Sequence, residues 1–293
     1  MLRALLISFA MLSSMLAAMR GPCAAQNTAP VAGIRSNQVD PSGDDSTAEN
    51  ELLGAANRSR ELAGVAPLRM EAALREAART HARQMVANQR LDHQFPGEPS
   101  LMQRIALVAS MNGPLSELRI DRAGENVADA SRALQAHESL MHSPPHRENL
   151  LDPRFNVVGV GAIWSKGRLY VVQDFAHELP SYSAPQAGKL VSQSVDEIRQ
   201  QAGLPDLAHL TPAKLDEAAC SLAKENHPNA HLLATAYENP RIVAYTQSRP
   251  EVLPQAALPL LRDPAVRQVA IGTCYARNPA YPTGTYWVAI LLY

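Results

Sequence analysis

The sequence is poor in aromatic residues and in cysteine, and it carries little net charge. Aromatic side chains make up 5% of the 293 residues, and the formal net charge is −1 at pH 7. The small aromatic share, together with many alanines, favours packing between helices over a β-sandwich. The near-neutral charge argues against a nucleic-acid partner, because proteins that bind nucleic acids carry strongly basic patches.

The remaining composition is that of a folded, globular chain. Hydrophobic residues make up 46% of the sequence and charged residues 19%, which is enough apolar surface to build a stable core. A length of 293 residues leaves room for one large domain or two modest ones.

The first 25 residues resemble an export signal in composition. Arg3 gives a positive start, an apolar run follows over residues 4–19, and Cys23-Ala24-Ala25 supplies the small residues that a signal peptidase accepts. A membrane-spanning helix needs about 20 mostly apolar residues, so this run is short for one. We therefore expect a signal peptide at 1–25, a secreted or periplasmic protein, and no transmembrane segment in the mature chain. An uncleaved anchor is the alternative, because Arg20 lies close to the cleavage region.

Cleavage would remove Cys23 and leave two cysteines, Cys220 and Cys274. In an oxidising compartment such a pair is more often a disulfide than two free thiols. The sequence therefore predicts a Cys220–Cys274 disulfide, the alternative being two buried thiols that never meet.

Changes in composition and in the spacing of apolar residues divide the remaining chain into segments. Residues 26–47 are rich in small polar residues, proline and glycine, and we expect them to be a disordered linker. Three- and four-residue spacing of apolar residues predicts helices at about 49–63, 71–88 and 131–142. Two strands joined by a hairpin turn are predicted at 157–164 and 169–175. A break follows at residues 180–188.

Beyond this break, the sequence partly repeats itself. The segment Arg60-Glu-Leu-Ala-Gly is matched by Arg199-Gln-Gln-Ala-Gly, and Leu74-Arg-Glu-Ala-Ala by Leu215-Asp-Glu-Ala-Ala. An Asp-Pro pair at residue 152 recurs at residue 263, each followed by a glycine nine residues after the aspartate. Three matches in the same order predict a degenerate second copy at 190–293, although each match alone is compatible with coincidence.

The second copy lacks part of the first. From Leu74 to Asp152 is 78 residues, whereas the corresponding distance from Leu215 to Asp263 is 48. The missing stretch includes the segments that carry most of the polar residues discussed below. We therefore expect the second copy to be structural, with its disulfide tying a helix to its sheet.

The best-defined motifs lie between residues 48 and 178. They are Gly124-Glu-Asn-Val-Ala128, Ser143-Pro-Pro-His-Arg-Glu-Asn-Leu-Leu151 and the hairpin from Val157 to Phe175. Together with Asn57, Arg60, Gly64, Pro67-Leu68, His81-Ala82 and Met85, they resemble the bacterial branch of the CAP superfamily. That family includes cysteine-rich secretory proteins, antigen-5 allergens and plant pathogenesis-related proteins.

The resemblance implies a fold of the α+β class. The expected architecture is a CAP-type α-β-α sandwich, in which helices flank a central antiparallel sheet. One complete CAP domain is expected at 48–180, and the reduced second copy at 190–293.

The resemblance also implies a polar cleft with four residues. In the CAP family this tetrad is commonly two histidines and two acidic residues. The matching positions here are His93, Glu125, Ser143 and His146. Ser143 stands where the second acidic residue would be, which weakens any chemistry that needs two carboxylates.

Two chemistries are open for these residues. His93 and His146 could bind Zn²⁺ or another divalent metal through neutral imidazoles, with the Glu125 carboxylate as a ligand or as an orienting group. The alternative is a hydrogen-bonded polar cluster that holds loops in place. Ser143 directly precedes two prolines, so a role in capping a turn is favoured over a role as a nucleophile.

Other histidines are expected to be structural. His81 lies on the apolar face of its predicted helix and is expected to be a hydrogen-bonded core residue. His137, His142 and His146 are close in sequence, but Pro144-Pro145 break the helical spacing between the last two.

The sequence therefore favours an exported, non-catalytic binding module over an enzyme. Its cleft would bind a divalent metal or a small apolar ligand, and its partner would be a small ligand or an envelope component. The alternative is a metal-assisted hydrolase that acts on peptides or cell-envelope material, with Glu125 as the base. A third hypothesis is a surface interaction protein whose second copy makes the contact.

Overall fold

The computed structural model describes residues 43–111, 118–234, 237 and 240–293. All of them fall within one compact unit, residues 37–293. The expected signal peptide at 1–25 and residues 26–42 of the expected linker lie outside the described residues. Residues 43–47 belong to the fold and not to a linker, because Asp44 pairs with Ile163 and the first helix begins at Ser46.

The N-terminal half, residues 43–180, alternates helices with the strands of one sheet. Its elements are α1 (Ser46–Leu62), β1 (Arg69–Met70), α2 (Ala72–Asn88), α3 (Leu101–Met111), β2 (Ile120–Ala130), α4 (Ala133–His142), α5 (Pro144–Leu151), β3 (Val157–Ser165) and β4 (Arg168–Glu178).

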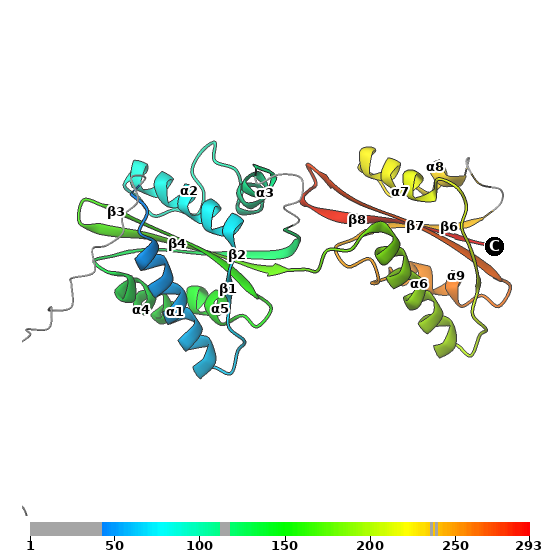
Figure 1. Cartoon of the computed structure of the whole chain (residues 1–293), viewed down its shortest axis with the longest axis horizontal. Helices are drawn as coiled ribbons and strands as arrows, with labels where there is room; N and C mark the ends of the chain where they lie inside the picture. The colour runs from blue at the N-terminus through cyan, green and yellow to red at the C-terminus, as the bar shows by residue number, and fades with distance from the viewer. Residues whose placement is uncertain (1–42, 112–117, 235–236, 238–239) are drawn as a thin grey trace, which may run out of the picture. The chain divides into compact units, whose positions relative to one another are not determined.

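The sheet of this half has the strand order β1-β3-β4-β2. Helices α1, α4 and α5 cover one face, and α2 and α3 cover the other (Figure 1). This half therefore has the predicted α+β composition, with helices on both faces of one sheet as in the predicted α-β-α sandwich. The sheet is not wholly antiparallel as predicted, because the short edge strand β1 pairs in parallel with β3.

Glycines in β3 allow α2 to lie close to the sheet. Val158 and Val160 face the α1 side and are fully buried, whereas Gly159 and Gly161 face α2. A Cβ on Gly159 would lie 2.0 Å from the backbone of Leu74, and one on Gly161 would lie 2.5 Å from the backbone of Ala78. Only glycine fits at these positions, because the helix backbone itself would have to move.

Most of the predicted elements form close to their predicted limits. The hairpin turn between β3 and β4 consists of Lys166 and Gly167, both with positive φ, which matches the right-handed twist of the strands. Helix α3 was not predicted. The Ser-Pro-Pro-His segment, predicted as a turn, is the start of helix α5, because proline is well tolerated in a helix's first turn, where its missing N–H costs no hydrogen bond.

The C-terminal half, residues 181–293, contains a second sheet. Its elements are α6 (Ala184–Gln201), β5 (Ala208–Leu210), α7 (Leu215–Lys224), α8 (Ala230–Ala234), β6 (Arg241–Gln247), the 3₁₀ helix η1 (Gln255–Ala257), α9 (Leu258–Leu261), β7 (Gln268–Asn278) and β8 (Tyr281–Leu292). The strand order is β5-β7-β8-β6, with α6 and α9 on one face and α7 and α8 on the other (Figure 1). Among the described helices, none combines the length and the apolar character needed to cross a bilayer.

The predicted disulfide is confirmed. Cys220 on α7 and Cys274 on β7 are bonded, so the bond ties a helix to the sheet that it covers. The closed loop spans a sequence separation of 54 residues, and a disulfide around a loop of this length stabilises mainly by restricting the unfolded chain.

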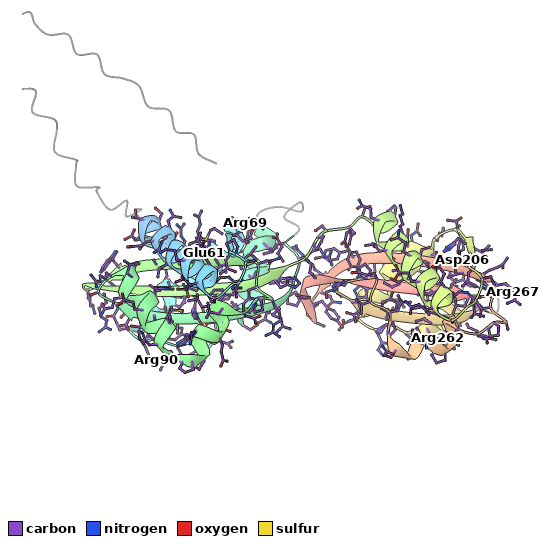
Figure 2. The ribbon with its side chains drawn as sticks, turned by 90° about the horizontal axis from the view of Figure 1, so that it is seen from below. Glu61, Arg69, Arg90, Asp206, Arg262 and Arg267 are labelled. Atoms are coloured by element: carbon purple, nitrogen blue, oxygen red, sulfur yellow. A yellow bond between two sulfur atoms is a disulfide. The ribbon has the colours of Figure 1, made fainter. Side chains whose placement is uncertain are left out.

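Each half contains one buried arginine that binds four backbone carbonyl groups. The surface charges labelled in Figure 2 are exposed on the outside of the ribbon, whereas Arg60 and Arg199 are each 0% exposed. Arg60 donates to the carbonyl oxygens of Ala66 (2.7 Å), Leu150 (2.9 Å), Asp152 (3.0 Å) and Phe155 (2.9 Å). Arg199 donates to those of Pro205 (2.7 Å), Leu261 (2.9 Å), Asp263 (3.3 Å) and Val266 (3.4 Å).

Candidate functional site

Strand β2 is the edge strand of the N-terminal sheet, and it carries the Gly-Glu-Asn motif. Because side chains alternate along a strand, Glu125 and Asn126 point to opposite faces. Asn126 faces α5, where its amide donates to the carbonyl oxygen of His146 (2.9 Å) and accepts from Asn149 (3.1 Å). Glu125 faces the α2 side. The sheet edge therefore brings together residues from helices on both faces.

His93 and Glu125 are in direct contact. The Nδ1 atom of His93 lies 2.8 Å from Oε1 of Glu125, and the His93 side chain is 60% exposed while that of Glu125 is 5% exposed. The hydrogen bond to Glu125 is the main reason that the pKa of His93 is raised, and burial opposes it. His93 thus sits at the surface with its Nδ1 atom engaged by a buried carboxylate.

His146 lies beside this pair. It is the third residue of α5, and its ring centroid is 6.5 Å from that of His93. Burial, and after it the nearby charge of His93, lowers the pKa of His146. The fold therefore brings together two histidines that are 53 positions apart in the sequence, with opposite pKa shifts.

Ser143 does not have the expected capping role. It occupies the N-cap position of α5, but its hydroxyl makes no capping hydrogen bond. One of the two usual donors is missing, because Pro145 at the second helical position has no N–H. Within the described residues, no hydrogen bond joins the Ser143 hydroxyl to His93, Glu125 or His146.

A buried ion pair lies beneath the surface histidines. Arg104 on α3 donates to Oε2 of Glu125, and the two side chains are 3% and 5% exposed. Arg104 also lies 3.7 Å from Glu98, and it donates to the carbonyl oxygen of His93 at 3.3 Å. Both carboxylate oxygens of Glu125 are therefore occupied, one by His93 and the other by Arg104.

His81 is the hydrogen-bonded core histidine that its helical position predicts. It is 0% exposed, with Nδ1 at 2.7 Å from Glu98 and Nε2 at 2.8 Å from the carbonyl oxygen of Asp92. Its Nε2 is also 3.9 Å from Glu125. His81 thus belongs to the same cluster through Glu98, which the sequence analysis did not single out.

Asp174 is a second buried carboxyl group at the site, and the sequence analysis missed it. It pairs in register with Glu125 across β4 and β2 and is 0% exposed. Burial first, and then the neighbouring Glu125, raise the pKa of Asp174 well above its ordinary value, while Arg104 opposes this. Among the described residues, neither carboxyl oxygen of Asp174 has a hydrogen-bond partner, and burial without a partner favours the protonated form of a carboxyl group. The signal in the sequence was a polar pair, Gln173-Asp174, inside an otherwise apolar strand.

Replacing Asp174 with asparagine tests its protonation. The folded-state pKa of Asp174 is raised, so its protonated form contributes stability that is present at low pH and lost as the pH rises through the folded-state pKa. The Asp174→Asn variant has no carboxyl group at this position and therefore lacks this dependence. We expect the difference in unfolding free energy, variant minus wild type, to increase as the pH rises from 4 to 8, because only wild type loses the contribution of the protonated carboxyl group.

Urea denaturation of both proteins across this pH range measures the difference. Asp206→Asn, at an exposed position (Figure 2), is the matched control and should show no such trend. A difference for Asp174→Asn that falls as the pH rises would mean that Asp174 is ionised in the folded protein.

The arrangement of His93 suits a metal-binding imidazole. A carboxylate bound to Nδ1 fixes the ring and leaves Nε2 free, which is a common arrangement around metal-binding histidines. The described part of the chain contains no group of three or more His, Cys, Asp or Glu residues placed to hold a metal ion. A metal at this site would therefore have at most two protein nitrogens, and the rest of its coordination would be open.

An apolar cavity lies next to the cluster, between α2 and α3. Its volume is about 530 Å³. Glu98 and Arg104 of the buried cluster contribute to its wall, and most of the remaining lining is apolar, including Phe95, Leu107 and Met111. This cavity was not foreseen in the sequence, because helix α3 itself was not predicted.

Comparisons with known proteins find similarity over the segment that contains the site. A family model described as the cysteine-rich secretory protein family, CAP, matches residues 53–175. The uncharacterized protein YkwD of Bacillus subtilis (strain 168) is 28% identical over 120 residues, which cover 40% of this chain and 43% of that protein. The match thus spans less than half of the curated relative's length.

Solved structures with similarity to this chain include two bacterial proteins. An extracellular protein containing an SCP domain from Bacillus anthracis str. Ames has 23% identity and a TM-score of 0.39, covering 45% of this chain and 40% of that one. An outer surface protein from Borrelia burgdorferi has 16% identity and a TM-score of 0.40, covering 46% of this chain and 95% of that one. The segment matched by the family model, residues 53–175, contains His93, Glu125 and His146.

Proposed function

We propose that this protein is an exported, non-catalytic binding module whose CAP domain binds a divalent cation at His93 and His146. The observation that carries the proposal is the contact of His93 Nδ1 with Glu125 at 2.8 Å, with His146 beside it at 6.5 Å between ring centroids. The contact leaves the outer nitrogen of His93 available to a ligand, and burial favours the neutral, metal-binding form of His146.

The same geometry argues against the metal-assisted hydrolase. A general base must be able to reach the water that it deprotonates. Glu125 is buried, and each of its carboxylate oxygens already has a charged or hydrogen-bonding partner. A carboxylate held in this way is suited to orienting His93 and poorly suited to accepting a proton from water.

Export is part of the proposal. It rests on the basic start and apolar run within residues 1–25. The disulfide between Cys220 and Cys274 supports it, because structural disulfides are typical of oxidising compartments. A protein that leaves the cytoplasm would form this bond on the way to its final location.

We further propose that residues 190–293 are a reduced second CAP copy. The two sheets have the same strand order, β1-β3-β4-β2 and β5-β7-β8-β6, with the same parallel and antiparallel pairings. In both halves the buried arginine binds carbonyl groups at the same relative positions. Gly64 and Gly203, which follow the two arginines, also share a positive φ of 71° and 70°.

The register of the second sheet supports the loss of the polar site. Arg60 binds the carbonyl group of Asp152, and Arg199 binds that of Asp263. Treating these two aspartates as equivalent positions aligns β3 with β7. By this alignment the neighbours Glu125 and Asp174 of the first sheet correspond to Ile242 and Leu291 of the second. The site carboxyl groups are thus replaced by apolar side chains, as a scaffold without a binding site requires.

Metal binding is tested with the purified full chain. We expect Zn²⁺, Mn²⁺ or another divalent ion to raise the midpoint of thermal unfolding, since an ion at ten times its Kd stabilises a protein by about 1.4 kcal/mol. The His93→Ala/His146→Ala variant should lose this shift, whereas His227→Ala/His231→Ala, at exposed histidines of the C-terminal half, should retain it. Titration calorimetry on the same proteins measures the affinity.

Two results would overturn parts of the proposal. The absence of any shift with the tested ions, or a shift that the double variant retains, would reject His93 and His146 as a metal site. Turnover of peptide or cell-envelope substrates that Glu125→Gln abolishes without unfolding the protein would establish the hydrolase instead.

A further inference from the structure

Arg119 precedes strand β2 and is nearly buried, and most of its partners come from the C-terminal half. It is 3% exposed. Its guanidinium donates to the carbonyl oxygens of Pro180 and Ser248. Its central carbon lies 4.4 Å from the ring centroid of Tyr286, 5.1 Å from Tyr275 and 6.0 Å from Tyr182.

These three tyrosines, here called the tyrosine cage, are held in place by their own hydrogen bonds. The hydroxyl of Tyr286 accepts from the backbone N–H of Tyr182 and donates to its carbonyl oxygen, each at 2.9 Å. The hydroxyl of Tyr275 donates to the carbonyl oxygen of Thr283 at 2.6 Å. The ring of Tyr286 lies 5.4 Å from that of Tyr275 and 6.4 Å from that of Tyr182. The cage is therefore built within the C-terminal half, and Arg119 enters it.

The charge of Arg119 is balanced without a carboxylate. In the described part of the chain, no Asp or Glu forms an ion pair with Arg119. Most of the other buried or partly buried arginines either pair with a carboxylate or bind several carbonyl groups. A buried cation needs compensation. Here the electron-rich faces of three aromatic rings and two carbonyl oxygens provide it.

A cavity of about 750 Å³ adjoins the tyrosine cage. Asp216, Glu217 and Lys224 contribute to its lining, together with the disulfide between Cys220 and Cys274. A small soluble cation therefore has a route to the cage if the Arg119 side chain is removed.

We infer that the tyrosine cage is a binding site for a guanidinium group and that Arg119 is its internal occupant. Arg119 directly precedes β2, so its binding in the cage fixes the start of this strand. A second contact acts at the same place, because Thr283 of the C-terminal half donates to the carbonyl oxygen of Ile120 at 3.1 Å. Strand β2 carries Glu125 five residues further on. The C-terminal half thus braces the strand that bears the site, which is a role independent of any metal or ligand at His93.

Chemical rescue tests this inference in the full chain. Arg119→Ala should lower the thermal midpoint by about 5 °C or more and should accelerate amide hydrogen exchange at residues 120–123 by at least about ten-fold. Millimolar methylguanidinium should restore part of both losses in Arg119→Ala and should have no such effect on wild type. Arg122→Ala, an exposed arginine on the same strand, should show neither loss nor rescue.

Two further proteins separate the cage from simple packing. Arg119→Met keeps much of the side-chain volume without the charge, and it should lose as much stability as Arg119→Ala. Rescue should also fail in Arg119→Ala/Tyr286→Leu, which lacks one ring of the cage. Wild-type stability of Arg119→Met, no response of Arg119→Ala to methylguanidinium, or equal rescue by tetramethylammonium, which has no N–H donors, would each overturn the assignment.

Discussion

Replacement of Arg104 with methionine is expected to destabilise the protein by about 3–5 kcal/mol, because it leaves a buried carboxylate without its counter-charge. Glu125 is 5% exposed and receives its buried hydrogen bond from Arg104. Asp174 lies opposite Glu125 in the sheet and supplies no positive charge in place of Arg104. Urea denaturation at pH 7, followed by circular dichroism, measures the loss.

A double variant distinguishes this cause from the loss of packing around Arg104. Adding Glu125→Gln removes the negative charge, so Arg104→Met/Glu125→Gln should recover at least about half of the loss, because the two residues are coupled. Arg147→Met, at an exposed position, should change the unfolding free energy by less than about 0.5 kcal/mol. A double variant as unstable as Arg104→Met alone would mean that Arg104 acts by filling space.

Replacement of Arg60 with methionine is expected to cost about 4 kcal/mol, since four buried or partly buried carbonyl groups lose a charged donor. Two of these carbonyls belong to Leu150 and Asp152 at the end of α5, and another to Phe155, which precedes β3. Arg60→Lys should be nearly as costly, because an ammonium group cannot reproduce the planar set of donors. Thermal and urea unfolding of both variants measure the effect.

The matched control is Arg58→Met, two residues earlier on the same helix and exposed. It should shift the unfolding free energy by less than about 0.5 kcal/mol. Arg199→Met should be about as destabilising as Arg60→Met if the two halves share one design. A small effect of Arg60→Met would show that water or backbone movement can satisfy these carbonyls.

Three of the residues named from the sequence lie together in the structure. His93, Glu125 and His146 were named from motifs that resemble a family, and the fold brings them to one sheet edge. Ser143 was assigned by the same resemblance, but among the described residues no hydrogen bond joins its hydroxyl to any of the three. A motif assigns a residue to a position along the chain, whereas contact also depends on the direction in which the side chain points.

The missed residues of the site share a physical reason. Arg104 lies on a helix whose periodicity was not identified, and Asp174 lies in a strand that was predicted for its apolar residues. Period-two alternation tells which face a strand residue occupies, but the residue opposite it depends on register. Buried charges are therefore hard to predict, since their compensation comes from residues that are distant in sequence.

The sequence by itself determined the helices and strands with clear periodicity, the disulfide between Cys220 and Cys274, and the resemblance of residues 48–178 to the CAP family. These features depend on local spacing, on residue type or on motifs of fixed order. Only the tertiary structure decided that Asp174 faces Glu125, that Arg104 pairs with Glu125, and that Arg119 enters the tyrosine cage. Each of these contacts joins residues far apart along the chain, and their energies depend on a burial that only the folded chain creates.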